Sequence, residues 1–334
     1  MAEIKSTSDS ASCESRFVKN PIHIPPTEVS AMTLRHRSGV SARRYQLAVI
    51  CSLLCACFIA WGCQTTPVSG RRKLALFTPE PKEIKLGEEA YEQILSKEQL
   101  SKNEQYIEIV NRVGKRIAAV SGRDDFEWEF RVIASDQQNA FALPGGKVAV
   151  HEGIIPVCQS EAGLAVVMSH EIAHALARHG GERMQDQTIQ NLGGKGIDFV
   201  GKWFLEEEYD KHQELVLTAY GVGSKYVRTL PYSRMHETEA DLIGIKLMAE
   251  AGYDPSEAPL FWERFSAAKS GDAPMEFLST HPSDARRAAD LRGSLPDALK
   301  IYNEAPQQFG LGDRLMVVES TNVELPLVSN TVIR

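Results

Sequence analysis

The chain has 334 residues and 43% apolar content, enough to bury a substantial core in one large domain or two small ones. Its net charge of −7 is uneven: residues 1–63 hold seven Lys or Arg against four Asp or Glu, and residues 64–334 hold 30 against 40. This acidic body argues against a nucleic-acid partner, since phosphate binding needs clustered Lys and Arg. Of the six cysteines only Cys158 follows residue 63, which excludes a disulfide or a cysteine zinc site within the body.

The first 62 residues have the composition of a leader. Residues 1–31 are polar and rich in Ser and Pro, which predicts disorder or a misassigned extension ahead of a true start at Met32. Residues 32–62 carry a basic segment without acidic residues and then the apolar run Leu47–Trp61, which is the order of a signal peptide. N-terminal sequencing of the precursor tests the start at Met32.

Cys63 follows Gly62 and opens a polar turn, so it resembles the lipid-modified cysteine of bacterial lipoproteins. Residues 63–78 are then a linker behind a lipid anchor, and the protein is expected in the bacterial periplasm, at the outer membrane. Ala60 and Trp61 depart from the usual signal, which has Leu and a small residue there. The alternatives are an uncleaved anchor, whose 15 apolar residues are short for a bilayer of about 30 Å, and a mitochondrial presequence.

Residues 79–334 are expected to form one α+β domain that is mostly helical and has a small β-sheet. Apolar periodicity predicts amphipathic helices over about 80–100 and 103–120. Alternating apolar and polar residues predict a strand at 128–134, and a Pro-Gly-Gly turn predicts a hairpin over 139–151.

The sequence HEIAH at residues 170–174 is the pattern in which two histidines share one helical face and can bind one zinc ion. Glu171 on the same face can take a proton from water and deliver it to a leaving amine. Ser160 is the expected N-cap and Gly180-Gly181 the expected C-terminal stop. An apolar stripe beside the histidines predicts that the helix is buried.

Residues 181–230 contain two glycine clusters without the spacing of a phosphate-binding loop, so no nucleotide is expected. A flexible lid and a loose helical hairpin both fit this segment. A helix over about 234–251 carries Glu237 and Asp241 four residues apart, opposite an apolar stripe. A helix over about 254–268 and a short helix from about 284 follow, and the last 40 residues are expected to form a helix and then strand-like pieces.

A catalytic zinc normally has three protein ligands and one position for water, so the two histidines need a third ligand. Many carboxylates are candidates on pattern alone, and Glu237, Glu239 and Asp241 form only one of several acidic groups. A solvated helix face is the alternative interpretation of Glu237.

Four segments together resemble the HExxH gluzincin endopeptidase family of HtpX, BepA, the CAAX prenyl endopeptidase and the mitochondrial overlapping-activity protease. The resemblance runs from about residue 63 to 293, and HExxH followed by E-x-x-A-D is its most specific part. CQTTPVSGRRKL at Cys63 is similar to the start of the bacterial lipoprotein members. The four segments are SHEIAHALARH at Ser169–His179, SRMHETEAD at Ser233–Asp241, NAFALPGG at Asn139–Gly146 and THPSDARR at Thr280–Arg287.

The resemblance implies a role for each residue of the site. Glu171 would be the general base, and Asp241 would orient a ligand histidine. Arg234 would support the acidic ligands by charge pairing. The residues that would bind one catalytic zinc ion are His170, His174 and Glu237.

The resemblance also implies substrate contacts and a regulatory histidine. Asn139, Ala140 and Phe141 would lie on an edge strand that flanks the active-site cleft and pairs with an extended polypeptide. His281 would approach the zinc as a regulatory ligand or help at the oxyanion, with helix capping as the alternative.

The expected function is zinc-dependent hydrolysis of extended, misfolded or unassembled cell-envelope proteins. The expected partners are polypeptides and a membrane, without nucleic acid or nucleotide. The chain has neither the several apolar spans of CAAX-type relatives nor room after His281 for the helical repeats of BepA. The alternative is a latent protease that acts mainly as a chaperone-like envelope assembly factor. Glu171→Gln separates the protease from the assembly factor, because only a binding factor would keep its function in cells.

Overall fold

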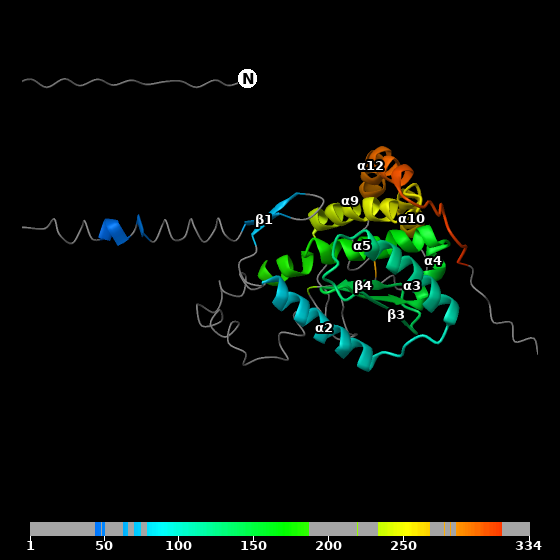
Figure 1. Cartoon of the computed structure of the whole chain (residues 1–334), viewed down its shortest axis with the longest axis horizontal. Helices are drawn as coiled ribbons and strands as arrows, with labels where there is room; N and C mark the ends of the chain where they lie inside the picture. The colour runs from blue at the N-terminus through cyan, green and yellow to red at the C-terminus, as the bar shows by residue number, and fades with distance from the viewer. Residues whose placement is uncertain are drawn as a thin grey trace, which may run out of the picture. The chain divides into compact units, whose positions relative to one another are not determined.

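The computed structural model describes residues 44–47, 49–50, 63–65, 70–74, 79–186, 219, 233–267, 277, 281 and 285–315 (Figure 1). Contacts divide the chain into two units, Met1–Leu54 and Cys55–Arg334, and the described residues of the first are helical. No helix in these described ranges is long and apolar enough to cross a bilayer. The expectations for the extension, for most of the signal peptide, for most of the lid or hairpin and for most of the strand-like C-terminal pieces fall outside the described residues. The domain boundaries stay predictions.

Three strands form a small mixed sheet in the order β3-β5-β4: β3 (Glu129–Ile133), β4 (Ala140–Leu143) and β5 (Lys147–His151). β5 pairs in parallel with β3 and antiparallel with β4. Gly145 and Gly146 form the β4–β5 turn with φ angles of 85° and 86°, a region that glycine enters without strain. The predicted strand and hairpin are confirmed, and β4 forms one edge of the sheet.

Two amphipathic helices precede the sheet, as predicted: α2 (Glu80–Lys97) and α3 (Glu104–Ala119). The Asn103 side chain caps α3 by accepting a hydrogen bond from the Tyr106 N–H. α3 packs on β3, whereas α2 packs on β4 and β5 from the opposite face (Figure 1). The cluster on the α2 face includes Leu86, Ala90, Tyr91, Phe141, Leu143 and Ala149.

The helix that carries HEIAH, α5 (Glu161–Leu176), lies in the centre of the domain (Figure 1). Ser160 caps it as predicted, because its side chain accepts a hydrogen bond from the Gly163 N–H. All 16 residues of α5 are buried, so its polar side chains face the protein interior. The short η1 (Glu152–Ile154) and α4 (Ile155–Cys158) connect β5 to this helix.

The motif helix ends before Gly180-Gly181, and the predicted stop there is wrong. α5 ends at Leu176, and Arg178 breaks the helix with a left-handed φ of 57°. A second helical stretch then runs over 179–186 and contains both glycines. The Arg178 guanidinium lies 2.6 Å from a carboxylate oxygen of the buried Glu83, so a tertiary ion pair holds the break where local propensity favours glycine.

Three later helices complete the described domain: α9 (Arg234–Glu250), α10 (Glu257–Ala267) and α12 (Ala285–Glu304). α9 crosses α5 at Gly244, where an added Cβ would lie only 3.2 Å from the backbone nitrogen of His170. This close approach brings the acidic residues of α9 beside the histidines of α5. α12 has 20 residues and covers both the short helix predicted from about 284 and the start of the helix predicted after it, and it packs on both α9 and α10.

A two-stranded ribbon precedes α2. β1 (Cys63–Thr65) and β2 (Arg72–Leu74) pair antiparallel, with Cys63 opposite Leu74.

Helices cover both faces of the three-stranded sheet β3-β5-β4. The domain is therefore α+β and mostly helical, which confirms the predicted fold class.

Candidate metal centre

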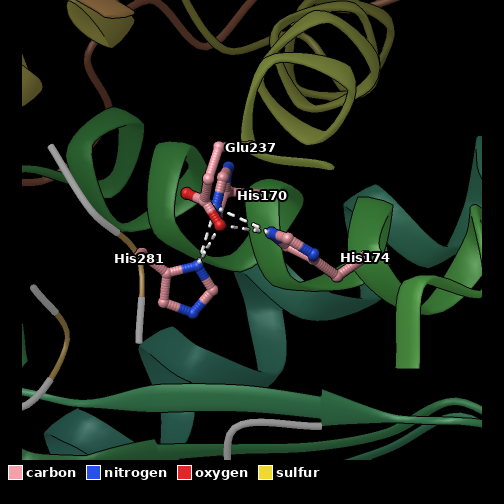
Figure 2. Close-up of side chains that lie close together, drawn as sticks. All are labelled: His170, His174, Glu237 and His281. Carbon is pink, nitrogen blue, oxygen red and sulfur yellow. Dashed lines mark hydrogen bonds and ion pairs between the residues drawn. The ribbon is translucent and has the colours of Figure 1, made fainter. Parts of the chain in front are cut away.

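Four side chains from three parts of the chain converge in the interior (Figure 2). His170 and His174 come from α5, Glu237 from the first turn of α9, and His281 from the segment that precedes α12. All four are buried, and one ligand atom from each lies within 4.8 Å of the others. Residues 111 positions apart in the sequence are thus in direct contact.

The separations between these atoms match a tetrahedral zinc site. Nε2 of His170 lies 3.1 Å from Nε2 of His174 and 3.2 Å from Nδ1 of His281. The Glu237 oxygens lie 3.1 Å from Nδ1 of His281 and 3.5 Å from Nε2 of each of the other two histidines. Zinc bonds of about 2.0–2.1 Å place neighbouring ligand atoms roughly 3.4 Å apart. The donor set therefore fits zinc, with one donor more than the three protein ligands of a catalytic site.

The other two candidate third ligands on α9 have different partners. Asp241 Oδ1 lies 3.0 Å from Nδ1 of His170, the ring nitrogen on the far side from the centre. This contact orients the imidazole and leaves its Nε2 for a metal. Glu239 contacts His179 and Arg71 instead. Glu237 and Asp241 are both buried and do not lie on a polar face, because α5 and α12 pack against α9.

Arg287 of α12 is the residue of the site that sequence reasoning missed. Its guanidinium lies 2.8 Å from Glu237 and 2.7 Å from Asp241, and its central carbon lies 3.6 Å from the centroid of the Trp262 ring. The predicted pairing of Arg234 with the acidic ligands is wrong, because Arg234 is exposed at the start of α9 and has no ion pair with any described residue. The available signal was the THPSDARR segment, which ends at Arg287.

Positive charge keeps the buried carboxylates of the site ionised. Burial by itself would raise the pKa of Glu237, but the electrostatic effects of the neighbouring His281 and Arg287 hold that pKa well below its ordinary range. Burial opposes ionisation of Asp241 in the same way, and Arg287 is the main group that lowers its pKa. Both carboxylates are therefore charged at neutral pH, as a metal ligand and its supporting group need to be.

Glu171 behaves differently from these two carboxylates. Burial raises its pKa to about 7, and the nearby His281 offsets part of that effect. Its Oε1 lies 3.4 Å from Nε2 of His281 and has no hydrogen-bond partner in the described part of the chain. A carboxyl group with a pKa near neutrality can both accept and release a proton, which amide hydrolysis requires.

The residues predicted to bind substrate lie at the start of the edge strand β4. Asn139 directly precedes this strand, and its side-chain oxygen accepts a hydrogen bond from the Ala140 N–H at 3.0 Å. Phe141 is the second residue of β4. The Phe277 N–H donates to the Gln138 carbonyl at 3.2 Å, so the segment that leads into the centre lies against this end of the strand.

This geometry belongs to the zinc-dependent metallopeptidases. They combine a buried HExxH helix with a third ligand from a neighbouring element and with a glutamate beside the metal position. Within that class the chain belongs to peptidase family M48, which matches residues 104–295. The predicted family, the predicted zinc metalloendopeptidase class and the predicted zinc cofactor are confirmed.

Several characterised relatives are similar over most of the domain. The mitochondrial metalloendopeptidase OMA1 of Schizosaccharomyces pombe is 39% identical over 241 residues, which cover 70% of this chain and 66% of the yeast protein. The human mitochondrial metalloendopeptidase OMA1 is 31% identical over 252 residues, or 71% of this chain and 47% of the human protein. The beta-barrel assembly-enhancing protease of Escherichia coli is 29% identical over 230 residues, or 69% of this chain and 47% of that protein.

Proposed function

We propose that the protein is a zinc endopeptidase that cleaves extended, misfolded or unassembled proteins of the cell envelope. The convergence of His170, His174 and Glu237 beside Glu171 carries this proposal. The edge strand β4 supports an extended substrate, because a strand at the edge of the described sheet can bind a peptide backbone by adding a strand. Similarity to a relative named as a beta-barrel assembly-enhancing protease supports an envelope protein as the substrate.

In the proposed mechanism His170, His174 and Glu237 would hold one zinc ion, and that ion would supply Lewis acidity toward the scissile carbonyl and the attacking water. Glu171 takes a proton from that water and passes it to the leaving amine, a transfer that suits its pKa of about 7. Asp241 keeps His170 in the tautomer with a free Nε2. Because water attacks the carbonyl directly, no acyl-enzyme intermediate forms.

We also propose that His281 is a gate. Its Nδ1 lies 3.2 Å from Nε2 of His170 and 3.1 Å from Glu237, in the corner that water and substrate need. The conformation described here is then latent, and substrate binding displaces the imidazole. The same closed geometry favours the second candidate function, an assembly factor that binds clients along β4 while its zinc is blocked.

His281→Ala is expected to raise casein hydrolysis by on the order of tenfold, as for a gate that is open in roughly 10% of wild-type molecules. One equivalent of zinc should remain, because three protein ligands are left. Initial rates and zinc content by mass spectrometry, on the wild type and on the variant, measure both effects. The double variant with Glu171→Gln is the control and should be inactive. Loss of zinc from His281→Ala would contradict the gate, and a wild type without zinc would contradict the function.

The N-terminal segment supports a proposal for the cellular location. We propose a lipid anchor at Cys63 in the bacterial periplasm, at the outer membrane. Cys63 is the first residue of β1, so cleavage before it would leave the β1–β2 ribbon intact. The similarity to mitochondrial proteins favours the alternative of a presequence. Cys63→Ser should move the protein from the membrane to the soluble fraction of a bacterial host and abolish labelling by a fatty-acid precursor; unchanged membrane association would count against the anchor.

A further inference from the structure

A second group of polar side chains, three of them buried and two half-buried, lies beside the metal centre, on the side of His174. We call this group the His179 cluster; it consists of Arg71, His179, Glu182, His236 and Glu239. The two imidazoles of the cluster stack with ring centroids 4.4 Å apart. Four of its members come from the helical stretch 179–186 and from α9, and Arg71 directly precedes β2.

One continuous chain of contacts joins this cluster to the metal centre. Nδ1 of His174 lies 2.9 Å from Nδ1 of His179. Nε2 of His179 in turn lies 3.1 Å from Oε2 of Glu239. The same Glu239 oxygen is contacted by Nε of Arg71, whose Nη2 lies 2.5 Å from Glu182. Each link is a direct hydrogen bond or ion pair, without a gap.

The direction of the hydrogen bonds follows from the chemistry of a metal ligand. His174 presents Nε2 to the centre, and a neutral imidazole that binds a metal through Nε2 carries its proton on Nδ1. That N–H points at Nδ1 of His179, which must then be the acceptor. His179 therefore carries its own proton on Nε2 and donates it to Glu239. The hydrogen bonds therefore point in one direction: His174 donates to His179, and His179 donates to Glu239.

We propose that His179 is a positioning residue that orients the zinc ligand His174, with Glu239 and Arg71 fixing His179 in turn. This inference rests on the proposed function, because it takes His174 as a ligand. The two ligand histidines are held differently: His170 contacts the Asp241 carboxylate directly, whereas His174 reaches the Glu239 carboxylate through a second imidazole. Through Arg71, the segment that follows Cys63 is coupled to the geometry of the metal centre.

The test measures the zinc dissociation constant of the full-length protein by competition with a chelator. His179→Leu removes the acceptor for the His174 proton and should raise the constant by about 10–100-fold. His179→Asn should restore binding to within about threefold of the wild type, because the amide oxygen can accept the same proton. His236→Asn is the matched control, because it removes another buried imidazole of the same cluster. In the described structure that ring is not bonded to His174. The variant should change the dissociation constant by less than about threefold.

The proposal is overturned if His179→Leu binds zinc as tightly as the wild type. It is also overturned if His236→Asn weakens binding as much as His179→Leu, because general packing would then explain the loss. If His179→Leu does not fold, Arg71→Ala decides the question: a constant raised by about threefold or more supports the coupling, and an unchanged constant contradicts it. A wild type that binds no zinc would defeat the proposed function itself, an outcome distinct from equal binding by wild type and His179→Leu.

Discussion

Glu171→Gln is expected to lower the rate of peptide hydrolysis by about 100–10,000-fold while one equivalent of zinc stays bound. Glutamine has nearly the size of glutamate, and Glu171 is not among the grouped ligand atoms, so the metal centre should be unchanged. The amide cannot accept a proton from water at neutral pH, so the proton transfer is lost. Casein digestion, zinc content and thermal unfolding of wild type and variant measure this effect.

The best background for this comparison is His281→Ala, where the proposed gate is open and activity is highest. Glu250→Gln, an exposed acid at the far end of α9, is the matched control and should keep wild-type activity. In cells, Glu171→Gln also separates the two candidate functions. A protease loses its cellular role with Glu171→Gln, whereas an assembly factor that acts by binding keeps it. Full hydrolysis by Glu171→Gln would contradict the assignment of the general base.

Arg287→Met is expected to lower the free energy of unfolding of the zinc-free protein by about 3–5 kcal/mol. The variant keeps much of the side-chain volume against Trp262 but removes the positive charge that faces Glu237 and Asp241. Two buried carboxylates then lose their common counter-charge, and an unpaired buried charge is among the most destabilising changes known. Urea unfolding in the presence of a chelator measures the difference.

Arg234→Met is the control for this prediction, because Arg234 was the arginine expected from the sequence to support the acidic ligands. It is exposed, so its replacement should change the free energy of unfolding by less than about 0.5 kcal/mol. Equal losses in the two variants, or a larger loss for Arg234→Met, would show that the ion pairs of Arg287 do not stabilise the centre.

Local spacing was sufficient to predict the parts of the site that lie on single elements. Histidines four residues apart in residues 170–174 share a helical face wherever that helix packs, and the same period places Asp241 one turn beyond Glu237. The hairpin that turns at Gly145-Gly146 and the Ser160 cap are equally local, because neighbouring residues set the turn geometry and supply the acceptor for the first N–H groups of the helix. The family resemblance added Glu237 and His281, which no spacing rule could join to the histidines.

Only the tertiary structure decided which side chains meet from distant segments. Arg287 and not Arg234 neutralises the acidic residues, because α12 packs across α9 and turns one arginine inward. Arg178 and not glycine breaks the motif helix, because Glu83 of α2 holds its guanidinium. His179 supports His174 through a contact that the break makes possible. The sequence by itself therefore determined the secondary-structure elements and the residues on each face of them. Long-range packing determined which side chains contact each other, which are buried and how their charges balance, because these properties depend on contacts that no local pattern encodes.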